Sequence, residues 1–80
     1  MHELGVLCEA VKMVNGIAEK NRISRVKHIT LEVGKDSGYV PAFFEKLFPV
    51  AIDPLPLLAG SELKILMAEG KGLIVKEIGY

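Results

Sequence analysis

The sequence predicts an α/β protein of the α+β type, in which two helices pack on one face of a small mixed three-stranded sheet, in the order α-β-α-β-β. Apolar residues recur at steps of three and four along residues 3–20, which is typical of an amphipathic helix. Residues 25–33 alternate between apolar and polar side chains, the period of a half-buried strand. A second helical pattern at residues 39–52 is followed by two more strand-like segments, which completes the predicted order.

Length and composition favour one globular domain, residues 1–80, because half of the side chains are apolar and a quarter are charged. Ten basic residues balance ten acidic ones, so the charge gives no reason to expect a nucleic-acid partner or a membrane surface. The single Cys8 cannot form an internal disulfide, and no apolar run reaches the roughly 20 residues of a membrane span. The N-terminus also lacks signal-peptide features, so we expect a cytoplasmic protein.

The first predicted helix should bury one apolar stripe. Its members are Leu4, Leu7, Cys8, Val11, Val14, Ile17 and Ala18. Because Cys8 lies within this stripe, we interpret it as a small core residue rather than a reactive thiol.

The strand predicted at residues 25–33 has one face for the core and one for solvent. The inward side chains are Ile29, Leu31 and Val33, and the outward ones are His28, Thr30 and Glu32. We interpret His28 as a solvent-facing sheet residue rather than a metal ligand. Residues 34–38 are rich in residues that favour a turn.

All three Phe residues of the chain fall in the second predicted helix, residues 39–52, where Pro41 suits the first turn. Pro49 lacks a backbone N–H, so we expect the helix to kink or end near Phe48. The connector at residues 53–60 contains three leucines, which we expect to pack over the sheet edge. A partner-binding patch is the alternative interpretation of these leucines.

The last two strands are predicted at residues 61–69 and 73–78, around the turn Gly70-Lys71-Gly72. Leu63, Ile65 and Met67 should face the core. A strand–helix–strand unit favours parallel pairing of the first two strands. The short turn favours an antiparallel hairpin between the last two.

The most unusual chemistry lies at the N-terminus, in Met1, His2 and Glu3. The α-amine, the backbone nitrogen of His2 and the His2 ring can close adjacent chelate rings on one cation, and the backbone nitrogen of Glu3 offers a fourth donor. Four nitrogens in a plane suit Ni(II) or Cu(II), and binding would depend on pH because the donors must lose protons. The alternative is that His2 is simply a solvated residue at a chain end.

The sequence resembles the HypA/HybF family of hydrogenase maturation proteins over nearly its whole length. The segments that carry the resemblance are Met1-His2-Glu3-Leu4, residues 25–34, residues 37–41 and residues 60–65. The resemblance implies a nickel-binding metallochaperone for [NiFe]-hydrogenase, with His2 as ligand, Met1 supplying its amine and Glu3 its amide nitrogen. It also implies a HypB-type GTPase and the hydrogenase large subunit as partners. It extends to no other binding residue.

The sequence departs from this family where members carry a zinc domain with two Cys-x-x-Cys pairs, between the second and third strands. Here Glu69 runs directly into Gly70-Lys71-Gly72, so we expect no zinc and a tight turn near 69–72 in place of that domain. Further departures at Lys35-Asp36, Pro49 and residues 53–56 bear on docking to the GTPase more than on metal binding. The protein is expected to be a monomer or a homodimer.

Two other functions remain open. The chain could be a protein-interaction module that binds a HypB-type GTPase without a metal role, which the lost zinc domain and the Leu-Pro connector favour. Enzyme activity is not expected, because Cys8 lies in the predicted core and neither histidine has an assigned catalytic partner.

Overall fold

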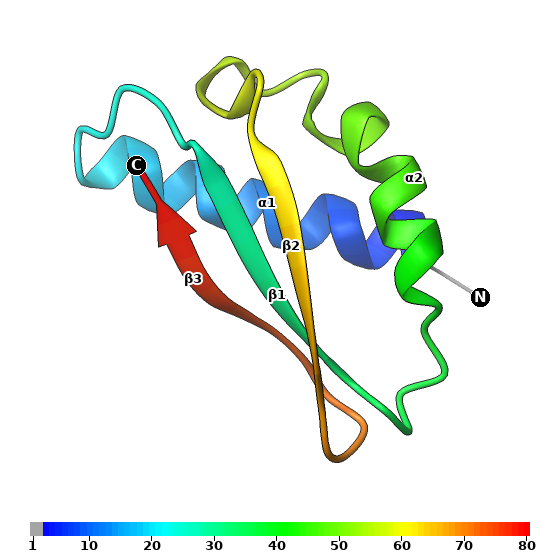
Figure 1. Ribbon diagram of the computed structural model, residues 1–80. Helices are drawn as coiled ribbons and strands as arrows, with labels where there is room; N and C mark the ends of the chain where they lie inside the picture. Colours follow the sequence, from blue (N-terminus) through cyan, green and yellow to red (C-terminus); the bar gives the residue numbers. More distant parts are fainter. Residues whose placement is uncertain (1–2) are drawn as a thin grey trace.

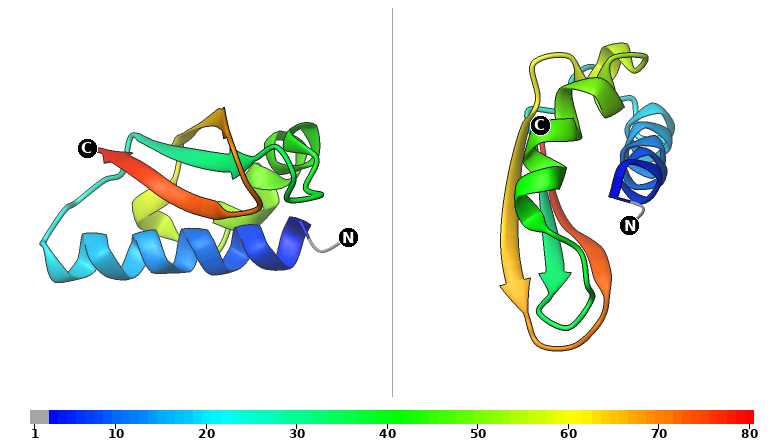
Figure 2. Two further views of the ribbon diagram at one scale, coloured as in Figure 1. Left: turned by 90° about the horizontal axis from the view of Figure 1, so that it is seen from below. Right: turned by 90° about the vertical axis from the view of Figure 1, so that its right-hand side faces the viewer.

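The computed structural model describes residues 3–80 and confirms the predicted class and order of elements (Figure 1). The elements are α1 (Glu3–Lys20), β1 (His28–Gly34), α2 (Pro41–Ile52), the 3-10 turn η1 (Pro56–Leu58), β2 (Glu62–Ala68) and β3 (Leu73–Gly79). The long helix α1 lies across one face of the sheet, and α2 lies on the same side, next to the β2 edge (Figure 2). Among the described residues, no helix combines the length and apolarity that a membrane span requires.

The core lies between the helices and the inner face of the sheet. Its buried members are Leu7, Val11, Val14, Ala18, Val26, Ile29, Leu31, Val33, Phe44, Phe48, Ala51 and Leu58. On the strands, two predicted positions differ from the structure: Met67 is 47% exposed although it was expected in the core, and Thr30 is buried although it was expected to face solvent. Met67 lies near the end of an edge strand, while Thr30 pairs with Lys64 and Glu77 on either side within the central strand.

The strand order is β2-β1-β3, so the predicted hairpin between the last two strands is wrong. β1 pairs with β2 in parallel, as predicted, and with β3 in antiparallel orientation, with a bulge between Thr30 and Leu31. The connection from β2 to β3 therefore passes over the end of β1, at Gly34. The backbone N–H of Gly34 donates to the Gly72 carbonyl at 2.7 Å, and the N–H of Asp36 donates to the Gly70 carbonyl at 2.8 Å.

The backbone after Lys20 explains why α1 ends there, as the sequence predicts. Arg22 adopts a left-handed backbone conformation with φ of 55°. The N–H of Ile23 donates to the Ala18 carbonyl at 2.9 Å, and the N–H of Arg22 donates to the Glu19 carbonyl at 3.2 Å. These two bonds form a Schellman motif, which ends the helix and turns Ile23 back onto the core.

Helix α2 continues to Ile52, in agreement with the predicted range, so of the two outcomes expected from Pro49, a kink or an end near Phe48, the end is wrong. Pro49 falls in its last turn, where the missing N–H leaves only the Glu45 carbonyl without its intrahelical donor. Both residues are exposed, so this carbonyl can bond to water. After α2, Leu58 is fully buried and the Leu57 carbonyl accepts the Val26 N–H at 2.8 Å. The leucines of the connector therefore pack on the core, with η1 against α1, whereas packing over the sheet edge was expected.

Candidate metal centre

Of the three residues predicted to bind metal, the structure describes Glu3, which is the first residue of α1. Met1 and His2 lie outside the described residues. One residue of extended chain spans at most about 3.6 Å, so the donors of these two residues lie within about 7 Å of the Glu3 backbone. The position of Glu3 therefore defines where any terminal metal site can form.

The Glu3 side chain is buried, with only 4% of its surface exposed. Its Oε2 atom accepts a hydrogen bond from the Val40 backbone N–H at 3.1 Å. A buried carboxylate is costly unless it is hydrogen-bonded, and this bond to an amide meets part of that requirement. The carboxylate is thus directed toward the protein interior and held by a backbone group far away in sequence.

Val40 is the N-cap residue of α2, and α2 has no side chain of its own to cap it. In a capping box, a Glu three residues into a helix accepts the N–H of that helix's N-cap residue. The corresponding position in α2 is Phe43, which cannot accept a hydrogen bond. Glu3 takes this role from another helix, so the start of α1 is tied to the start of α2.

The segment before Val40 is also ordered by local contacts. The Ser37 hydroxyl oxygen accepts the Tyr39 N–H at 3.2 Å, and the Ser37 N–H donates to the Gly34 carbonyl at 3.1 Å. The Tyr39 ring packs against the Phe44 ring with centroids 5.5 Å apart and a 52° tilt. The Val40 N–H is therefore presented to Glu3 by a segment that is anchored on both sides.

The backbone nitrogen of Glu3 is in a suitable place for a metal donor. The first four N–H groups of a helix have no intrahelical partner, so deprotonating the Glu3 amide breaks no helical hydrogen bond. The starts of α1 and α2 both carry partial positive charge, which disfavours an additional protonated amine nearby. A cation that displaces the amine proton and two amide protons would relieve this repulsion.

The other metal-ligand candidates are not assembled into a site. Within residues 3–80, no three His, Cys, Asp or Glu side chains gather closely enough to hold a metal ion. His28 lies on the outer face of the sheet, where its ring covers the backbone of Gly79 and its Nε2 is 3.4 Å from a Glu77 carboxylate oxygen. Cys8 is half-buried and packs against the core, in agreement with its interpretation as a structural residue.

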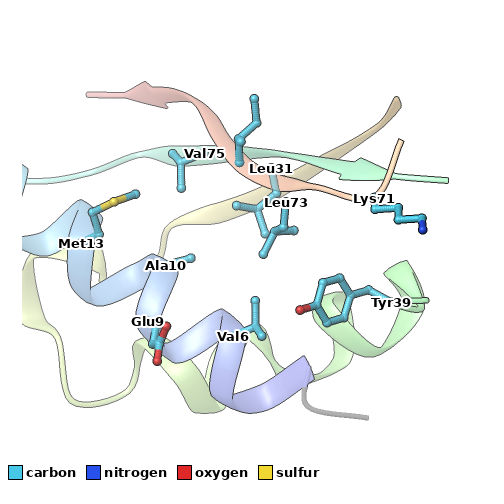
Figure 3. Close-up of a pocket in the computed structure, with 10 residues that line it drawn as sticks. Val6, Glu9, Ala10, Met13, Leu31, Tyr39, Lys71, Leu73 and Val75 are labelled. Atoms are coloured by element: carbon cyan, nitrogen blue, oxygen red, sulfur yellow. The ribbon is translucent and has the colours of Figure 1, made fainter. Parts of the chain in front are cut away.

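A groove of about 740 Å³ lies between α1 and β3 (Figure 3). Val6, Ala10 and Met13 line its helix side, Leu31, Leu73 and Val75 line its sheet side, and Tyr39 lies at one end. Glu9 and Lys71 are the charged residues of its lining. The lining is mainly aliphatic and lacks a convergent set of polar groups, so the groove itself suggests no chemistry.

The family resemblance implies the Glu3 amide as a metal donor and, for the Glu3 side chain, a supporting role at the site or in the contact with the GTPase. The bond from the Val40 N–H to the carboxylate was not found from the sequence. One signal was present: Phe43, at the capping-box position of the second helix, cannot accept the N–H of the N-cap residue. This signal does not indicate which acceptor takes its place.

Comparisons with known proteins agree with one another. A family model described as "Hydrogenase/urease nickel incorporation, metallochaperone, hypA" matches residues 1–74. A relative named Hydrogenase maturation factor HypA, from Crocosphaera subtropica, is 39% identical over 72 residues, covering 90% of this chain and 60% of the relative. Another of the same name, from Methanosarcina barkeri, is 36% identical over 53 residues, covering 66% of this chain and 40% of that protein.

The fold is also found in a solved structure. The solution structure of the Ni metallochaperone HypA from Helicobacter pylori superimposes with a TM-score of 0.78, over 96% of this chain and 72% of that chain. The sequences are 15% identical, so this likeness shows a common fold. The chain spans about 60% of the length of the Crocosphaera relative. The family resemblance inferred from the sequence is confirmed.

Proposed function

The chain belongs to the HypA family, and from this premise we propose that it is a nickel-binding carrier for hydrogenase maturation. Residues 1–80 act as one nickel-binding unit, with Met1, His2 and Glu3 as its site. The cation is cargo, which the protein binds and releases without turnover chemistry. The names of the relatives support this proposal, since they describe nickel incorporation and hydrogenase maturation.

The observation that carries the proposal is the buried and hydrogen-bonded side chain of Glu3 at the start of α1. The α-amine, the His2 amide nitrogen and the His2 ring supply three nitrogen donors, and the Glu3 amide nitrogen supplies the fourth. Nitrogen donors in a plane favour Ni(II) over the cations that prefer oxygen. Because the side chain of Glu3 is anchored, the donor that Glu3 supplies is already held in place before the ion binds.

The proposal is tested by titrating Ni(II) into protein with an unmodified N-terminus and recording the absorption of the square-planar complex. We expect binding by the parent chain and by His28→Ala, which removes the other histidine of the sequence. We expect loss of the square-planar spectrum in His2→Ala and in a chain that carries one extra residue before Met1. Full-strength square-planar binding by either of these two variants would refute the site.

A second candidate function is supported by exposed apolar side chains near the same end of the molecule. Leu4, Val40 and Phe43 are 37–44% exposed, although they lie on or beside helices that are otherwise packed against the core. Such residues are suited to protein contacts. In this interpretation the chain binds a HypB-type GTPase and needs no metal to do so.

The two functions are separated by a binding measurement with a purified HypB-type GTPase, with and without nickel. Phe43→Ser should weaken the complex if this surface docks the partner, whereas Ile74→Ser, an apolar residue 54% exposed on the sheet, should not. Partner binding that is indifferent to nickel and to His2→Ala favours the interaction module. Partner binding that requires nickel and an intact His2 favours the carrier.

A further inference from the structure

Glu3 has two parts with different environments, and only one of them belongs to the proposed chelate. Its amide nitrogen lies at the free start of α1, while its carboxylate is buried and accepts the Val40 N–H at 3.1 Å. The Oε2 atom of the carboxylate is bonded to the backbone of α2, and the proposed chelate uses only the Glu3 amide nitrogen. Any effect of the Glu3 side chain on the site therefore comes from where it holds the backbone of Glu3.

We propose that Glu3 is a positioning residue, whose carboxylate ties the start of α1 to the start of α2 and so holds the terminal nickel site in one place. This inference rests on the proposed function, because it concerns the same three residues. The nitrogen donors bind the ion, whereas the Glu3 carboxylate holds the start of α1 in place. The carboxylate contacts the protein only, and its effect on nickel is indirect.

The geometry supports a restraint that acts directly on the chelate. The donors of Met1 and His2 lie within about 7 Å of the Glu3 backbone, so a fixed Glu3 confines them to a small volume. Val40 is itself fixed, because its carbonyl accepts the Phe43 N–H at 2.9 Å and Pro41 follows it directly in the helix. The restraint therefore connects the chain end to the second helix and not to a mobile surface group.

Ordering the donors in advance reduces the entropy lost when the ion binds. Without the Glu3–Val40 bond, the first turn of α1 loses its only described tertiary hydrogen bond and must be reordered each time nickel binds. We expect the loss to appear mainly as faster release of nickel, by about twofold to tenfold, the range for ordering one or two residues. Helix α2 would lose its cap at the same time.

The test uses side-chain variants that leave every proposed donor atom in place. Glu3→Ala removes the acceptor. Glu3→Asp keeps the charge but shortens the side chain by one methylene. Glu3→Gln keeps an oxygen of the same reach and should largely restore the contact. Glu9→Ala, an exposed glutamate on the same helix, is the matched control.

Two measurements are made on each variant with an unmodified N-terminus. In metal-free protein, hydrogen exchange and the chemical shift of the Val40 amide report the contact itself. In nickel-loaded protein, competition with a chelator reports the release rate through the square-planar absorption. We expect Glu3→Ala and Glu3→Asp to lose protection at Val40 and to release nickel faster, while Glu3→Gln and Glu9→Ala remain close to the parent.

The outcomes distinguish the two levels of the proposal. If the parent gives no square-planar complex, the proposed function fails and the positioning role fails with it. If the parent binds nickel but Val40 is unchanged in Glu3→Ala and Glu3→Asp, the contact is absent in solution and the inference is overturned. If Val40 loses protection while nickel release stays the same, Glu3 is only a helix cap and the inference is also overturned.

Discussion

The crossing of the β2–β3 connection over the end of β1 makes a sharp prediction about Gly34. A methyl group placed on Gly34 would lie 2.7 Å from the Gly70 carbonyl carbon and 2.9 Å from the Gly72 nitrogen, separations too short for ordinary contact. These neighbours are backbone atoms of the crossing segment, so they cannot move aside as a flexible side chain does. The Gly34→Ala variant must therefore displace the connection from the sheet.

The expected cost has two parts. Forcing extra volume into a close-packed position costs about 1–3 kcal/mol. Displacing the connection also strains the bonds from Gly34 N–H to the Gly72 carbonyl and from Asp36 N–H to the Gly70 carbonyl, each worth about 0.5–1.5 kcal/mol. We expect Gly34→Ala to lower the free energy of unfolding by about 2–6 kcal/mol in total, which is comparable to the whole stability of a domain this small.

Gly16→Ala is the matched control, because the chemical change is identical and the environment is open. A methyl group on Gly16 meets nothing within 4 Å, and the residue lies inside α1. Alanine is favoured over glycine in a helix by about 0.5–1 kcal/mol, so this variant should be more stable than the parent. Urea unfolding followed by circular dichroism measures both variants. Gly34→Ala at parental stability would refute the crossing, and with it the observed strand order.

The remaining predictions concern the helix end and the metal. Arg22→Gly should raise the free energy of unfolding by about 1 kcal/mol, since Arg22 holds a left-handed conformation that costs a non-glycine residue about 1–2 kcal/mol. Thermal unfolding measures this change, and an unchanged or lower midpoint temperature contradicts the prediction. Nickel affinity should fall as the pH is lowered, because each nitrogen donor must release a proton to bind; isothermal titration at several pH values, with proton release measured from the buffer dependence, tests this. Elemental analysis of purified protein should find no retained zinc, because one cysteine cannot supply the ligand pairs of the family's zinc domain; stoichiometric zinc would refute that expectation.

Periodicity was sufficient to predict the elements and the inner face of β1. The alternation of Ile29, Leu31 and Val33 is reproduced as buried side chains, and the helical spacing of Leu7, Val11 and Val14 is reproduced in the core. The same patterns did not determine which apolar residues at the margins of a helix face are buried. Leu4 and Ile17, counted in the apolar stripe of α1, are 41% and 39% exposed, because they lie on the margins of the buried stripe of Leu7, Val11, Val14 and Ala18.

The strand order could not be predicted from the short connection between the last two strands. Neighbouring strands lie about 4.8 Å apart, so strands on either side of β1 are separated by about 10 Å. The four residues 69–72 can span that distance as readily as they can close a hairpin, since each adds up to about 3.6 Å. The deciding feature is Gly34, whose missing side chain leaves room for the crossing, and Gly34 contacts this segment only in the folded structure.

The proposed terminal site shows a further limit of sequence patterns, because its donors are consecutive in sequence while the contact of Glu3 is not. The donors of Met1, His2 and Glu3 can be listed from three consecutive residues, without any fold. Glu3 itself is anchored by the Val40 N–H, across 37 positions of sequence, and this N–H is free to pair with Glu3 because Phe43, at the capping-box position of α2, cannot accept it. An N–H at the start of α2 thus finds an acceptor, and a carboxylate buried at the start of α1 finds a donor. Phe43→Glu would offer a competing acceptor for the Val40 N–H and is therefore expected to weaken the hold on Glu3, although it changes no residue of the proposed site.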